Sequence, residues 1–176
     1  MTRMPDWLQE KLFERRMVLV TGRLDDALAS QAAAQILTLD ATGDAPIDVV
    51  VDSGEGTLEA AFVLMDVMDA ARATVRVRCR GRVEGPAVGV VAAGDERSAS
   101  PHTVFRLIAP SVAASGTAEQ ITAQSEAHRV LLWRFQARVA RTTGRPVEDV
   151  AEDMRKGRYL AAQEAVDYRL LDTIGS

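Results

Sequence analysis

Four short runs of mostly β-branched residues constrain the fold of this chain more than any other feature of its sequence. Each run is bounded by Gly, Pro or Asp, and together they cover residues 17–20, 47–51, 75–79 and 104–108. Runs of this length and composition are typical of strands that are largely buried in a parallel sheet. The sequence therefore predicts a sheet-based fold and not a helical bundle.

The segments between these runs have the pattern of helices. Asp25 and Asp26 can cap an Ala-rich helix that reaches about Leu39, because a carboxylate satisfies free amides at a helix start. Apolar residues recur at helical spacing over 57–71, and the small apolar residues of 85–93 predict a buried helix. Repeated strand-helix-strand units imply right-handed crossovers and a layered α/β fold.

The pattern changes beyond Pro110. A Ser/Ala/Gly-rich stretch leads to a helical run over 117–143, which at 1.5 Å per residue reaches about 40 Å and is expected to protrude. Pro146 is predicted at the first position of the next helix, where its missing amide costs little. A last helix is expected over 161–168, and neither a linker nor a repeat divides the chain. Residues 1–176 are therefore predicted to form a single domain.

Charge and cysteine content exclude several classes of protein. The 21 basic and 25 acidic residues give a net charge of −4 with no basic stripe, which argues against a nucleic-acid partner. The single cysteine, Cys79, excludes an internal disulfide and a cysteine-based zinc site. No segment has the apolar length of a membrane span, and acidic residues interrupt the N-terminal segment where a signal peptide would be apolar. We expect a cytoplasmic protein without a metal or cofactor.

Several motifs in sequence order resemble ClpP, the proteolytic subunit of the Clp protease in the ClpP/crotonase superfamily. KLFERRMVLVTG (11–22) resembles the family's LLKERIIFLxG, and IDVVVDSGEG (47–56) stands where the family has IYLYINSPGG. CRGRVEGPA (79–87) stands at CxGxAASMG, and EAVDYRLLD (164–172) resembles EAxxYGLxD. The resemblance implies a spiral of β-α units with a protruding handle helix, here at approximately 111–143.

The same resemblance places the family's catalytic triad on residues that cannot perform its chemistry. The nucleophilic serine position holds Gly85, the histidine of the family's MIHQP motif falls on Ile108, and the orienting aspartate falls on Gly157. Acyl transfer by a serine needs a hydroxyl, an adjacent base and an orienting acid. None of these three residues supplies such a group.

The oxyanion hole is expected to be disabled as well. The family uses the backbone amide of the second glycine in SPGG, here Gly56, and the amide after the serine. Gly56 is retained, but the second position holds Pro86, which has no amide hydrogen. Loss of one such donor typically lowers the rate about a hundredfold to a thousandfold. We therefore expect a proteolytically inactive homologue of a serine endopeptidase.

Two alternatives remain open at the sequence level. Glu55 and Glu84 lie near the former site, and paired glutamates act as acid and base on acyl-CoA thioesters in the crotonase branch. The other alternative is a hydrolase with an unrecognised site. Both histidines have simpler interpretations, since His102 follows Pro101 in a polar turn and His128 lies on the long helix.

The resemblance also implies partners. ClpP subunits form seven-membered rings that stack through the handle, and AAA+ unfoldases dock on the outer faces. We expect a homo-oligomer or a mixed ring with ClpP paralogues. The family's aromatic docking residues correspond to Asp48, Val50 and Ala70, which weakens the expectation that an unfoldase docks. Arg155 and Lys156 replace an acid-base pair of the family, which weakens the expected contact between rings.

Overall fold

The computed structural model describes residues 5–110 and 115–175, and its centre is a mainly parallel sheet. Hydrogen bonding connects the strands in the order β1-β2-β3-β4-β7, and β3 also pairs with β5. β6 runs antiparallel to β5. The strands are β1 (Met17–Leu24), β2 (Ile47–Gly56), β3 (Val75–Glu84), β4 (Glu96–Ala99), β5 (Val104–Leu107), β6 (Arg158–Ala161) and β7 (Thr173–Ile174).

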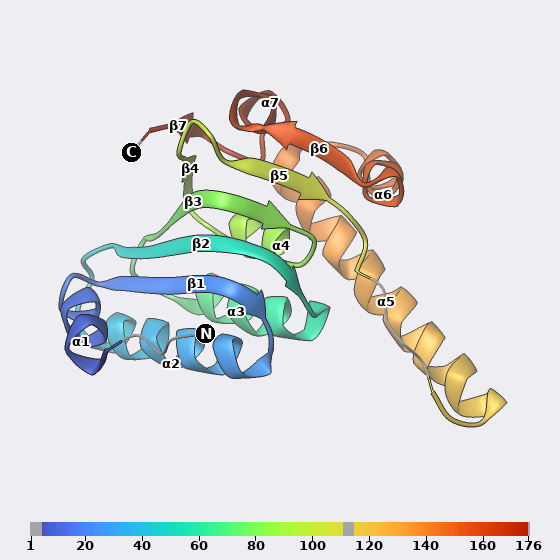
Figure 1. Cartoon of the computed structure of the whole chain (residues 1–176), viewed down its shortest axis with the longest axis horizontal. Helices are drawn as coiled ribbons and strands as arrows, with labels where there is room; N and C mark the ends of the chain where they lie inside the picture. Colours follow the sequence, from blue (N-terminus) through green and yellow to red (C-terminus); the bar gives the residue numbers. More distant parts are fainter. Residues whose placement is uncertain (1–4, 111–114, 176) are drawn as a thin grey trace.

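Three helices cover one face of this sheet (Figure 1): α2 (Asp26–Thr42), α3 (Leu58–Ala70) and α4 (Ala87–Ala92). The starts of α2 and α3 follow the usual capping chemistry. The Asp25 carboxylate accepts a hydrogen bond from the amide of Leu28, and the Thr57 hydroxyl accepts one from the amide of Ala60. The layered α/β arrangement predicted from the sequence is therefore confirmed.

The opposite face of β3 differs from the expectation of a largely buried strand. Val75, Val77 and Cys79 are buried, whereas the alternating Arg76, Arg78 and Arg80 lie on the other face. Carboxylates on neighbouring strands compensate two of these charges: Arg78 Nε lies 3.1 Å from Asp48 Oδ1, and Arg76 Nε lies 3.2 Å from Glu96 Oε2. The β3 part of this face is consequently polar, and α2, α3 and α4 all lie on the other face.

Helix α5 (Ala118–Thr143) projects away from the body of the molecule (Figure 1). Its buried residues, Phe135, Val139, Ala140 and Thr143, all lie in its last third, which anchors it against the core. Thr117 caps its start in a capping box with Gln120. The predicted 111–143 segment is thus described from residue 115 onward, while residues 111–114 lie outside the described part.

The remaining helices are α1 (Asp6–Glu14), α6 (Val147–Lys156) and α7 (Ala162–Asp167). Pro146 is the N-cap of α6, with ψ of 142°, so the prediction that it occupies the first helical position was wrong by one residue. The sequence pattern does not predict α1, β4 or β6. β4 and β6 are four-residue strands of mixed polarity that form through pairing with β3 and β5, which a local pattern does not reveal.

Candidate functional site

The ends of two adjacent strands bring positions 85 and 108 together. β3 and β5 run parallel with Glu84 opposite Arg106, so the residues that follow them meet at one sheet edge. The Gly85 amide donates a hydrogen bond to the Arg106 carbonyl at 3.1 Å. Among the described residues, chain neighbours aside, a Cβ atom built on Gly85 would contact only Ile108, with Cγ2 at 3.6 Å. A side chain at position 85 would therefore lie in van der Waals contact with an apolar neighbour.

Gly157 approaches the same strand from the other side. It ends α6 and precedes β6, which pairs with β5. The nearest atoms to a Cβ built on Gly157 all belong to Arg106, with Nη2 at 3.3 Å. Gly85 and Gly157 have φ of +54° and +68°, a left-handed conformation that favours glycine over any residue with a side chain. The three predicted positions therefore surround the end of β5.

Arg106 belongs to this site, although no sequence motif singles it out. Its guanidinium carbon lies 4.8 Å from the centre of the Tyr159 ring, and the two residues are paired across β5 and β6. Its Nε is buried without a hydrogen-bond partner. The only signal for it in the sequence is its position two residues before Ile108, on the same face of the strand.

Of the two expected oxyanion positions, Gly56 has a backbone N–H donor and Pro86 has none. Gly56 lies opposite Leu24 at the end of the β1-β2 pairing, and a Cβ atom there would come within 2.5 Å of the Leu24 carbonyl oxygen. Only glycine fits such an approach. Pro86 is the N-cap of α4 and is buried, so its missing N–H leaves no donor at this position.

The two glutamates of the acyl-CoA alternative have different surroundings. Glu55 is exposed and its Oε2 lies 3.1 Å from Arg23 Nη1. It lines a hollow of about 410 Å³ that also contains Asp52 and Arg82. Glu84 is half-buried beside Gly85. No hydrogen bond or ion pair of the described residues connects Glu84 with Glu55.

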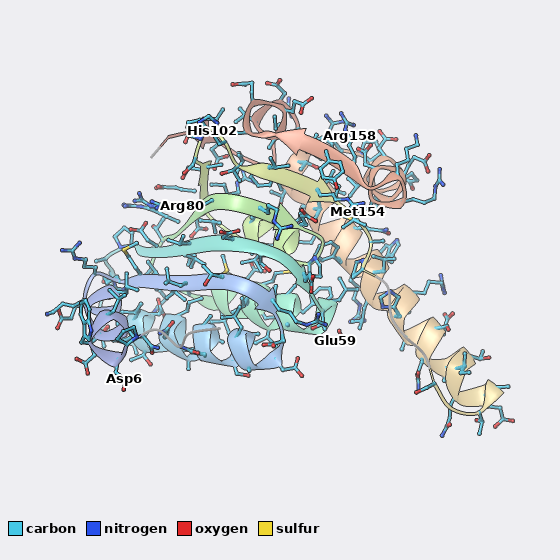
Figure 2. All side chains as sticks on the ribbon, in the orientation of Figure 1. Asp6, Glu59, Arg80, His102, Met154 and Arg158 are labelled. Atoms are coloured by element: carbon cyan, nitrogen blue, oxygen red, sulfur yellow. The ribbon has the colours of Figure 1, made fainter. Side chains whose placement is uncertain are left out.

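The histidines are not placed with a nucleophile. Figure 2 shows His102 at the start of β5 and Met154 near the opposite end of that strand. The Met154 carbonyl accepts a hydrogen bond from the amide of Ala109, which follows Ile108. His102 therefore lies at the other end of β5 from Ile108. His128 is half-buried in the middle of α5. Within 5–110 and 115–175, no serine is hydrogen-bonded to a histidine. Ser53 donates to the carbonyl of Glu55 within β2.

Cys79 is 1% exposed, and burial raises the pKa of its thiol well above the ordinary value. A buried neutral thiol is a poor nucleophile, in agreement with the interpretation of Cys79 as a strand residue. The described residues contain no group of three or more His, Cys, Asp or Glu side chains that could hold a metal ion. None of the helices in this part of the chain is both long and apolar enough to cross a membrane.

None of the positions expected at the partner contacts presents an exposed aromatic side chain. Asp48 forms the ion pair with Arg78, Val50 is buried, and Ala70 ends α3 at the surface. Arg155 and Lys156 both pair with Glu152 on their own helix. Hydrogen bonds from Arg155 and then Lys156 lower the pKa of Glu152 to about 2.

Comparisons with known proteins agree with this architecture. The Clp protease family model matches residues 3–176. An ATP-dependent Clp protease proteolytic subunit from Paracoccus denitrificans is 33% identical over 162 residues, which cover 91% of this chain and 81% of that protein. The ATP-dependent Clp protease proteolytic subunit 3 of Rhodococcus jostii (strain RHA1) is 31% identical over 175 residues, which cover 97% of this chain and 86% of that protein.

The fold has a counterpart among solved structures. A mutant of ClpP1 from Listeria monocytogenes superposes with a TM-score of 0.86 at 24% identity, and the match covers 96% of each chain. The structure is therefore an α/β ClpP fold. Because the family model spans almost the whole sequence and two relatives exceed 30% identity, the chain belongs to the Clp protease family.

Proposed function

We propose that this chain is a proteolytically inactive structural or regulatory subunit of a Clp-type ring assembly. The observation that carries the proposal is the group of Gly85, Ile108 and Gly157 around the end of β5, where the family requires a hydroxyl, an imidazole and a carboxylate. Pro86 adds the loss of an oxyanion donor. The relatives are named as proteolytic subunits, which supports a role within the same kind of assembly.

The distribution of charge supports self-association. Helices α2 and α3 contain no Lys or Arg, and three of their five acids, Asp26, Glu59 and Asp66, have no ion pair among the described residues. Two of the four arginines of β3, Arg80 and Arg82, likewise have no carboxylate partner there. The helices and the β3 arginines lie on opposite faces of one layer. Complementary patches on opposite faces favour a head-to-tail contact, and such heterologous contacts generate rings when the rotation closes. We place this assembly in the cytoplasm, with 111–143 as the handle of a single-domain subunit.

Labelling with a fluorophosphonate tests the loss of hydrolysis. The purified chain is expected to show no stoichiometric adduct and no cleavage of casein, whereas an active ClpP subunit treated in parallel is labelled. An adduct on any serine of this chain, mapped by mass spectrometry, would overturn the proposal and favour a hydrolase with an unrecognised site.

Co-purification tests the subunit role. A tagged copy produced in its native host is expected to retain untagged copies of itself or an active ClpP paralogue, identified by mass spectrometry. A chain that elutes alone as a monomer at micromolar concentration would contradict the assembly.

The acyl-CoA alternative rests on Glu84, the half-buried carboxylate beside Gly85. Glu55, its proposed partner, is held by Arg23 at the surface. Turnover of an acyl-CoA thioester that disappears in Glu84→Gln would establish this alternative in place of the inactive subunit.

A further inference from the structure

Arg106 is a half-buried cation that faces the former catalytic centre without an anion. Phe105 and Leu107 are fully buried on the core side of β5, which leaves Arg106 on the opposite face of the strand, toward Gly157. Among the described residues, no carboxylate forms an ion pair with its guanidinium, and its Nε has no hydrogen-bond partner. Partial removal of a charge from water without a counter-ion is unfavourable. An anion bound at this position would relieve that cost.

The guanidinium is also held in a defined place. It stacks on the Tyr159 ring at 4.8 Å, and the pairing of β5 with β6 fixes the two residues opposite each other. A stacked guanidinium keeps its N–H donors at its edge, in the plane that matches the two oxygens of a carboxylate. Arg106 therefore resembles a preformed receptor more than a mobile surface arginine.

The space around Arg106 suits a carboxylate that carries an apolar group. Gly157 places no side chain beside Nη2, and among the described residues, chain neighbours aside, a side chain at position 85 would contact Ile108. Glu84 lies opposite Arg106 in the strand register and is half-buried. Its negative charge disfavours anions of higher charge, such as phosphate, more strongly than a single carboxylate.

We propose that this site, formed by Arg106, Tyr159, Ile108 and the two glycines at 85 and 157, binds the free C-terminal carboxylate of a peptide. The carboxylate lies against the edge of Arg106, and the C-terminal side chain packs on Ile108 over Gly85. The inference rests on the proposed function, because it gives a ligand to a site that no longer cleaves. Peptides with a new C-terminus are the products of proteolysis, so an active subunit in the same assembly would supply them.

Isothermal titration of the intact, assembled protein tests this site. N-acetyl-alanyl-leucine is the probe, and its C-terminal carboxamide is the matched control. We expect the acid to bind at least about tenfold more tightly than the amide, the range of a charge-assisted hydrogen bond. Arg106→Gln should weaken binding of the acid by a similar factor and leave that of the amide unchanged. Glu84→Gln should strengthen binding of the acid.

Two controls separate this site from general attraction of anions. Arg15→Gln removes an exposed arginine at the end of α1, outside both this site and β3, and is expected to leave the affinity unchanged. Acetate carries the same charge without the apolar group and should bind at least about tenfold more weakly than the peptide. Equal affinity for acid and amide, equal affinity for acetate, or an unchanged affinity in Arg106→Gln would each overturn the proposal.

The design remains decisive if a variant fails to fold. The acid-to-amide ratio on the unmodified protein needs no substitution, and Arg106→Lys keeps the positive charge and should retain part of the preference. Hydrolysis or fluorophosphonate labelling reports on the proposed function separately. A protein that cleaves the peptide would fail the proposed function, while the Arg106-dependence of binding would still test the carboxylate site.

Discussion

At the scale of single residues, Arg106 changes what a reconstruction of the triad requires. An aspartate at position 157 would begin within 3.3 Å of Arg106 Nη2 and would pair with that guanidinium instead of orienting an imidazole at position 108. We predict that Gly85→Ser, Pro86→Met, Ile108→His and Gly157→Asp together give no peptidase activity above background. Adding Arg106→Met, the residue of the family's MIHQP motif at this position, should raise the rate at least about a hundredfold.

Hydrolysis of a fluorogenic peptide measures this difference, with the mass of the assembly as a control for folding. Left-handed φ at Gly85 and Gly157 adds a stability cost of about 1 kcal/mol for each new side chain. Full activity of the fourfold variant without the Arg106 change would show that Arg106 does not interfere.

The identities at positions 85, 86, 108 and 157 can be read from the sequence, because motif spacing carries them. The role of Arg106 cannot be read from the sequence, because it depends on the pairing of β5 with β6. The sequence pattern does not predict β6. The ion pair of Glu55 with Arg23 was hidden for a similar reason: the two residues are far apart in sequence and meet only through the β1-β2 register.

At the scale of elements, Asp40 joins the end of α2 to the turn after α3. Its Oδ1 accepts hydrogen bonds from the amides of Ala73 and Arg72, both at 2.8 Å, and these bonds lower its pKa below the usual 3.8. A carboxyl whose pKa is lower in the folded state stabilises the fold above its unfolded pKa. That contribution is lost as pH falls through the lower, folded value.

We therefore predict that Asp40→Ala lowers the urea midpoint of unfolding at neutral pH. The difference in midpoint between the variant and the unmodified protein should become smaller below about pH 4. Asp44 is an exposed acid in the following loop, and Asp44→Ala is the matched control. It should leave the urea midpoint unchanged at both neutral and acidic pH. A gap of the same size at about pH 3 and pH 7 would contradict a role for the ionised carboxylate.

Helix positions were predictable because caps and apolar spacing are local signals, as Asp25, Thr57 and the long α5 illustrate. The ends of the strands were less predictable from the sequence. β1 and β2 continue past their apolar runs through shifts of register near Gly22 and Ser53, which depend on the neighbouring strand. β7 is a two-residue strand defined by its contact with β4 alone.

At the scale of the whole molecule, the separation of charge predicts an association that depends on salt. Light scattering should give a mass above that of one 19.0 kDa chain, and the mass should fall as salt screens the contact. Arg80 has no ion pair among the described residues, so its substitution tests the contribution of β3 to association most directly. Arg80→Glu is expected to weaken association by about tenfold or more, because like charges then meet.

Sedimentation velocity over a concentration series measures this change. Arg15→Glu at the end of α1 reverses another exposed charge, outside β3, and should have little effect. Identical association of both variants would show that the β3 arginines do not contribute to the contact.

Cys79 gives this molecule a chemical measure of its own opening. The thiol is the only one in the sequence, and it lies between the sheet and the helix layer with 1% of its surface exposed. An aromatic disulfide reagent can reach it only when the interior opens, so the native protein should react at least about 10³-fold more slowly than the urea-unfolded chain. Rapid reaction without denaturant would contradict the burial. Measured with and without assembly, the reaction rate shows how far neighbouring subunits slow the exposure of each core to solvent.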